Sequence, residues 1–95
     1  MFLSAYHFDG DPTTLVPAYD RMQEGFPPDM FDLHACVVTG SGITVYDGCP
    51  SRADFERFAV SPEFRSGVAA AGLPQPRIQP LGEVHYAVAG KAVLR

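Results

Sequence analysis

The chain has 95 residues, of which 46% are hydrophobic and 19% charged, and its formal net charge is −4. This composition suits one compact domain over residues 1–95 and excludes a largely disordered chain. The seven Lys and Arg residues are scattered, so we expect no nucleic-acid partner and no membrane partner. The opening residues lack the pattern of a signal peptide, which favours a cytoplasmic location with Cys36 and Cys49 reduced.

The first predicted elements are a strand and a helix. Residues 2–8 alternate as a strand, with one face formed by Phe2, Ser4, Tyr6 and Phe8. A helical stripe follows, because spacings of four, three and four separate Leu15, Tyr19, Met22 and Phe26. Pro17 falls inside this segment, so we expect the helix to begin irregularly near Asp11 and to become regular by Leu15.

The strongest hairpin signal lies in residues 31–48, where two runs rich in β-branched and aromatic residues flank a Gly-Ser-Gly centre. A three-residue loop over residues 40–42, with Gly42 left-handed, would pair Thr39 with Ile43. One face would then carry Leu33, Ala35, Val37, Ile43 and Val45. The other would carry His34, Cys36, Val38, Thr44 and Tyr46. A two-residue loop would mix these sets, so the three-residue loop is favoured.

A second helical region follows the hairpin and is expected to be broken near Val60. Ser51 is the predicted cap of its first part, with Asp54 completing a capping box. Ser61 and the proline after it restart the helix, which should end at Gly72. The prolines at positions 74, 76 and 80 predict an extended connection. The last strand is expected over residues 83–88, with Val84, Tyr86 and Val88 opposite His85 and Ala87.

The resulting order, β-α-β-β-α-β, predicts a ferredoxin-like α+β fold with a four-stranded antiparallel sheet. Two helices can cover only one face, and the first strand should lie between the third and fourth. The covered face is expected to carry Phe2, Tyr6, Phe8, Leu33, Val37, Ile43, Val45, Val84, Tyr86 and Val88. The uncovered face stays apolar, with Leu3, Ala5, Cys36, Val38, Tyr46 and Ala87. Pairing with a second copy would remove it from water, so we predict a homodimer.

The topology, the length and the segment FERFAVSPEFR over residues 55–65 resemble the dimeric α+β barrel superfamily, which includes antibiotic-biosynthesis monooxygenase-like proteins. The resemblance implies sheets paired in a dimeric barrel and a ligand cavity between each sheet and its helices. Members include cofactor-independent monooxygenases, polyketide cyclases and haem-degrading enzymes. The chain departs from a cyclase motif of Tyr and His-Pro-x-His, because Phe58, Ser61 and Phe64 stand at the matching positions. It also lacks the Trp of haem-degrading members, and no cofactor is expected.

The expected cavity would hold a flat aromatic or polyketide-like metabolite. Its candidate ligand-binding residues are Ser4, Tyr6, Tyr19, Phe26, Phe55, Phe58, Phe64 and Tyr86. The alternative is that these aromatic side chains are simply core.

The catalytic candidates are His7, His34 and His85, with Tyr46, on the barrel-facing side of the sheet. His7 and His85 are expected to be neighbours. Cys36 lies two residues from His34, but no acidic ligand joins them in phase, so no metal site is predicted. Two functions stay open: a cofactor-independent enzyme that uses a histidine base and a tyrosine donor, and a non-catalytic binding or accessory protein.

Overall fold

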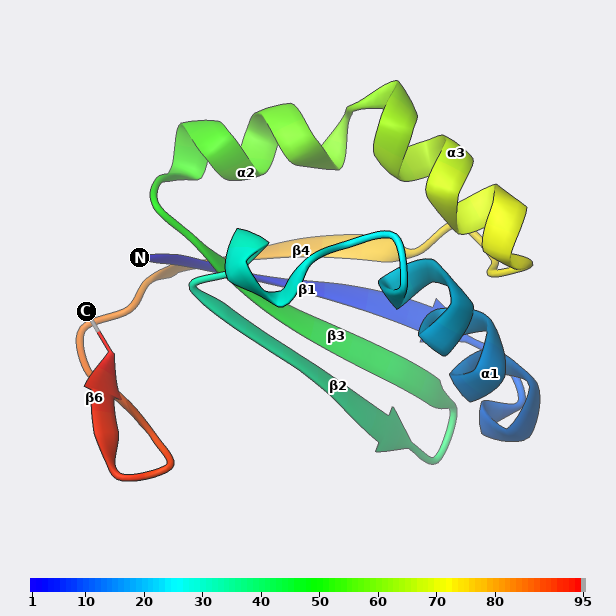
Figure 1. The fold of residues 1–95 in the computed structure, drawn as a ribbon, viewed down its shortest axis with the longest axis horizontal. Helices are drawn as coiled ribbons and strands as arrows, with labels where there is room; N and C mark the ends of the chain where they lie inside the picture. Colours follow the sequence, from blue (N-terminus) through cyan, green and yellow to red (C-terminus); the bar gives the residue numbers. More distant parts are fainter. Residues whose placement is uncertain (95) are drawn as a thin grey trace.

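The structure, a computed structural model, describes residues 1–94. Its main sheet is antiparallel with strand order β2-β3-β1-β4, formed by β1 (Phe2–Asp9), β2 (Leu33–Thr39), β3 (Gly42–Cys49) and β4 (Arg77–Glu83). Three helices and a single 3-10 turn pack on one side: α1 (Pro12–Gln23), η1 (Pro28–Met30), α2 (Arg52–Ala59) and α3 (Pro62–Ala71) (Figure 1). The fold is α+β and compatible with a ferredoxin-like arrangement. The predicted place of β1, between β3 and β4, is confirmed.

A small separate hairpin follows β4. It consists of β5 (Ala87–Ala89) and β6 (Ala92–Leu94) and stands away from the main sheet (Figure 1). Within residues 1–94, no helix is both long and apolar enough to cross a membrane.

The helix boundaries follow the predicted caps. The Asp11 carboxylate accepts a hydrogen bond from the backbone N–H of Thr13, and α1 runs through Pro17. The hydroxyls of Ser51 and Ser61 accept from amides three residues later and start α2 and α3. Gly72 ends α3 with φ 86°, in the left-handed conformation that glycine adopts without strain. The predicted break between the two helices is confirmed.

The core lies between the helices and one face of the sheet. The sheet contributes large buried side chains from its two central strands: Phe2, Tyr6, Phe8, Ile43 and Val45. The helices contribute Leu15, Ala18, Tyr19, Phe55, Ala59, Phe64, Val68 and Ala71. Every second position of β1 and β3 therefore points under the helices, as predicted.

The predicted register of the β2–β3 hairpin was wrong by one residue. Thr39 pairs with Gly42, so the loop has two residues, Gly40 and Ser41. Gly42 is a strand residue with φ 155°, and a Cβ added to it would lie 2.0 Å from the carbonyl oxygen of Phe8. Gly42, which was predicted to lie in the turn, is instead required by the close approach of β1.

This shift turns β2 over. Because side chains alternate along a strand, a one-residue slip exchanges its faces. His34, Cys36 and Val38 lie on the helix-covered face, since their partners are Asp47, Val45 and Ile43. The opposite face receives Leu33, Ala35 and Val37, whose partners are Gly48, Tyr46 and Thr44.

The position of the last sheet strand was also predicted wrongly. β4 starts at Arg77 and contains Pro80, which is tolerated because β4 is an edge strand with a pairing irregularity beside Ser4. Residues 84–88 therefore fall outside the main sheet. His7 lies opposite Arg77 instead of His85, and Tyr86 is 69% exposed instead of covered by helices.

The uncovered face of the sheet, which we call the back face, is largely apolar over β1, β2 and β3 as predicted, whereas β4 adds the polar residues Arg77 and Gln79 to it. It carries Leu3, Ala5, Leu33, Ala35, Val37, Thr44 and Tyr46, with His7 near one end. Val37 is 43% exposed, and Leu81 beside Leu3 is 45% exposed. An apolar side chain of this size in water is typical of a contact surface when it has apolar neighbours.

Candidate functional site

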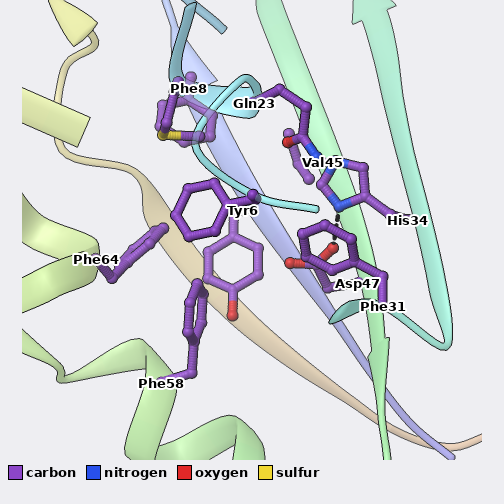
Figure 2. Close-up of a pocket in the computed structure, with 11 residues that line it drawn as sticks. Tyr6, Phe8, Gln23, Phe31, His34, Val45, Asp47, Phe58 and Phe64 are labelled. Carbon is purple, nitrogen blue, oxygen red and sulfur yellow. Dashed lines mark hydrogen bonds and ion pairs between the residues drawn. The ribbon is translucent and has the colours of Figure 1, made fainter. Parts of the chain in front are cut away.

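Two neighbouring pockets lie between the helices and the covered face of the sheet, and because they share lining residues we call them the inner and outer lobes of one cleft. The inner lobe, of about 20 Å³, is no larger than a water molecule, and the outer lobe has a volume of about 210 Å³. Four residues line both lobes: Tyr6, Phe31, Asp47 and Phe58. Figure 2 shows the inner lobe, where aromatic side chains from β1, α2, α3 and the segment before β2 converge.

A carboxylate and an imidazole meet at the sheet side of this cleft. His34 and Asp47 are directly opposite each other in the β2–β3 pairing, and both point under the helices. Their side chains are only 16% and 15% exposed, and Nδ1 of His34 hydrogen-bonds Oδ1 of Asp47 (Figure 2). An ionised carboxylate can only accept, so Nδ1 of His34 carries the proton.

Tyr19, a residue of α1, hydrogen-bonds the other ring nitrogen of His34. Its hydroxyl lies 2.5 Å from Nε2 of His34, and the two rings stack with centroids 5.9 Å apart. With the Nδ1 proton directed at Asp47, Nε2 of His34 accepts a hydrogen bond from the Tyr19 hydroxyl. Burial raises the pKa of Tyr19 to about 12, and the nearby charge of Asp47 adds to this effect, so Tyr19 is a donor at neutral pH.

The second carboxylate oxygen of Asp47 is directed away from His34, toward the side of the cleft that Tyr6 occupies (Figure 2). Burial is the main cause that raises the pKa of Tyr6 to about 12, although the nearby Ser4 hydroxyl lowers it and the charge of Asp47 raises it further. Tyr6 is therefore a neutral donor too. Asp47 thus offers the cleft an acceptor and Tyr6 offers it a donor, beside the other polar side chains of its linings, Ser4, Gln23 and Asp54.

The remaining walls are flat aromatic rings. Phe58 meets Tyr6 edge-on, with centroids 6.3 Å apart and an interplanar angle of 89°. The ring centroids of Phe64 and Phe58 are 4.8 Å apart, and those of Phe31 and His34 are 4.3 Å apart. Rings at these separations form apolar surfaces that suit another ring.

No protein-family model, curated protein or solved structure matches this chain. The cleft brings together a carboxylate held by an imidazole, a neutral phenol and a set of aromatic walls, and its carboxylate and phenol are groups that can accept and donate protons.

Most of the predicted ligand-binding residues lie at this cleft. Its linings include Ser4, Tyr6, Phe26, Phe55, Phe58 and Phe64. Tyr19 reaches it through His34, whereas Tyr86 lies outside the main sheet.

The structure separates the four catalytic candidates. The prediction that the three histidines share the uncovered face was wrong, because the corrected register places His34 in the cleft. His7 does lie on the back face, where its ring nitrogens hydrogen-bond Thr44 at 3.0 Å and Gln79 at 2.9 Å. Tyr46 is on the same face, and His85 is exposed in the connection after β4.

Two important residues of the cleft, Asp47 and Phe31, were not predicted. The signal for Asp47 was present in the rejected hairpin register, where it faces His34.

Cys36 shares a strand face with His34, but in residues 1–94 no three His, Cys, Asp or Glu side chains are grouped as a metal site would require. Burial raises the pKa of both Cys36 and Cys49, which favours their neutral thiol forms.

Proposed function

We propose that the chain binds a small aromatic metabolite in this cleft and catalyses proton transfer on it. The observation that supports this proposal is the His34–Asp47 pair, which lies largely buried against a cleft with aromatic walls. Burying a carboxylate and an imidazole together is costly, and an apolar pair would hold two strands together equally well. A carboxylate–imidazole pair next to a cavity is typical of an active site.

In this proposal each polar side chain of the cleft has a role. Asp47 accepts a proton at its second oxygen, from a ligand hydroxyl or from a carbon next to a carbonyl. His34 holds the first oxygen, and Tyr19 fixes the ring orientation of His34. Tyr6 donates a hydrogen bond to the ligand oxygen on which negative charge develops. The sequence-based assignment of a histidine as the base thus becomes a carboxylate base positioned by a histidine.

The wider reaction follows from the resemblance to the dimeric α+β barrel superfamily. It would be a cofactor-independent oxygenation or a cyclisation of an aromatic or polyketide-like metabolite. Forming an enolate is the first step of a cyclisation through carbon, and it needs only a base and a donor to the oxygen. Asp47 and Tyr6 meet that need without a cofactor.

We also propose that two copies pair through their back faces as a dimeric barrel. The support is the apolar surface of β1, β2 and β3 on the side that the helices leave uncovered. Burying apolar area stabilises an assembly by about 25 cal/mol per Å² before the cost of association is subtracted.

Deuterium uptake tests the proton transfer. Phenylacetone in D₂O exchanges its hydrogens next to the carbonyl, and NMR follows the loss of their signals. We expect the protein to accelerate this exchange above the buffer rate. Asp47→Asn should lower the acceleration at least 100-fold, because an amide does not take the proton. His34→Gln should lower it by about 10-fold, because it removes only the orientation of the base.

His85→Gln is the matched control, because His85 is exposed and lies outside the cleft. It should exchange at the wild-type rate, and thermal melts should show that each variant is folded. Exchange that persists in a folded Asp47→Asn protein would disprove this base assignment.

One contact favours the alternative, a binding or accessory protein without turnover. The Tyr19 hydroxyl occupies Nε2 of His34, so the imidazole has both nitrogens engaged, as in a structural polar network. This alternative predicts that aromatic compounds raise the melting temperature of the protein without any accelerated exchange.

A further inference from the structure

We propose that the ligand of this cleft is an uncharged compound with one aromatic ring and one hydroxyl or enolisable carbonyl group. The inference rests on the proposed function, because it concerns the same cleft, and it narrows the ligand to a class. It replaces the polycyclic skeleton of a polyketide by a single ring and excludes carboxylates, phosphates and ammonium groups.

The size of the outer lobe limits the number of rings. An apolar cavity of roughly 150 Å³ in a protein interior holds one benzene molecule. The outer lobe, at about 210 Å³, therefore holds one ring with a small substituent. The inner lobe adds only about 20 Å³, and Phe8 and Phe64 are among its walls. A skeleton of three fused rings would have to displace buried core side chains.

The charges around the cleft disfavour an anion. Among residues 1–94, neither lobe is lined by lysine or arginine, and the ionisable groups that face them include the carboxylates of Asp47 and Asp54. Arg57 pairs with Asp54, but its own side chain is 71% exposed, so its charge is solvated outside the cleft. An anionic ligand would lose its hydration and gain no cation in return.

The polar groups also disfavour a cation. Tyr6 donates and Asp47 accepts, and a hydroxyl group can both accept and donate. Once that hydroxyl pairs with Tyr6 and Asp47, an ammonium group elsewhere on the ligand meets no free carboxylate, because both oxygens of Asp54 are engaged, by Arg57 and by the Ser51 hydroxyl. The ammonium group would lose its hydration without gaining a partner. An enolisable carbonyl accepts from Tyr6 and presents its acidic C–H to Asp47. Both permitted groups are uncharged.

Isothermal titration with matched phenols tests this class. 4-Ethylphenol, tyramine and 4-hydroxyphenylacetate share one ring and differ in the charge of the side chain, whereas 2-naphthol and a hydroxyanthracene add rings. We expect 4-ethylphenol to bind at least 10-fold more tightly than the two charged compounds, and the hydroxyanthracene not to bind. Equal affinity for either charged compound, tight binding of the hydroxyanthracene, or no binding of 4-ethylphenol would overturn the inference.

Variants that widen the cleft test whether its walls set the selectivity for ligand size. Phe58→Ala widens both lobes and should improve binding of 2-naphthol relative to 4-ethylphenol at least 5-fold. If Phe58→Ala does not fold, Phe31→Ala is tested in its place, because Phe31 also lines both lobes. Tyr86→Ala, at an exposed side chain outside the main sheet, should leave the ratio unchanged. An unchanged ratio in the folded widened variants would contradict the inference.

The outcomes also separate this inference from the proposed function. Selective binding of 4-ethylphenol without accelerated deuterium exchange would support the ligand class and contradict the proton transfer. Accelerated exchange together with equal binding of the charged phenols would support the proton transfer and contradict the ligand class.

Discussion

Gly42→Ala is expected to destabilise the protein severely. An alanine Cβ at this position would lie 2.0 Å from the Phe8 carbonyl oxygen, and φ at Gly42 is 155°. The backbone of β1 cannot move away without losing its pairing with β3, which includes Asp9 opposite Gly42. Overpacking and an unfavourable φ together cost about 2–6 kcal/mol, a large part of the roughly 5–15 kcal/mol by which a domain is stable. The melting temperature should fall by more than about 10 °C.

Gly40→Ala is the matched control, two residues away in the same hairpin. A Cβ at Gly40 would meet no atom within 4 Å. Replacing glycine where the conformation permits it stabilises by about 0.4–1 kcal/mol, so this variant should melt at or slightly above the wild-type temperature. Chemical denaturation of both variants measures the difference. Equal stability of the two variants would contradict the two-residue loop.

Val37→Glu is expected to convert a dimer into monomers. Val37 lies on the back face and is 43% exposed, so a glutamate there should not disturb the single subunit. In a dimer paired through this face, the carboxylate would be buried without a partner, which costs about 3 kcal/mol or more. The dissociation constant should therefore rise roughly 100-fold or more. Size-exclusion chromatography with light scattering at micromolar concentration should show a wild-type dimer and a Val37→Glu monomer.

Val60→Glu provides the control for this experiment. Val60 is 66% exposed at the break between α2 and α3, on the helix side of the molecule. This variant should remain a dimer. Tyr46→Glu tests the same face from β3 and should also give monomers or unfolded chains. A monomeric wild type, or a Val37→Glu variant that still dimerises, would contradict the proposed barrel.

Local signals in the sequence were sufficient for the starts of the helices and for the end of α3, whereas α1 ends at Gln23, before Phe26, which was predicted to belong to it. Ser51, Ser61 and Gly72 each act within one turn of the chain, so their caps could be predicted without knowing the partners of the helices. The alternation in β1 was equally readable. The strand order followed from the element order, because few topologies connect these elements without crossings.

The predictions failed at residues whose role depends on a segment that is distant in the sequence. Gly42 resembles a turn residue until β1 is placed beside it. Pro80 resembles a connection until its strand is known to lie at a sheet edge. The hairpin register was chosen because it kept one strand face apolar. That choice missed the pairing of His34 with Asp47, two polar residues whose place on the covered face packing alone does not explain. Functional sites are where such rules are expected to fail.

The central place of β1 affects how the chain folds. Its two neighbours are residues 42–49 and residues 77–83, so this strand stays unpaired on one or both sides until most of the chain has been made. Such distant contacts slow folding, toward the millisecond-to-second range of domains dominated by non-local pairing. Until then the side chains of Phe2, Tyr6 and Phe8 stay exposed to water. An unpaired apolar strand of this kind can pair with other chains and start aggregation. Aggregation during synthesis should therefore depend on how soon β4 becomes available.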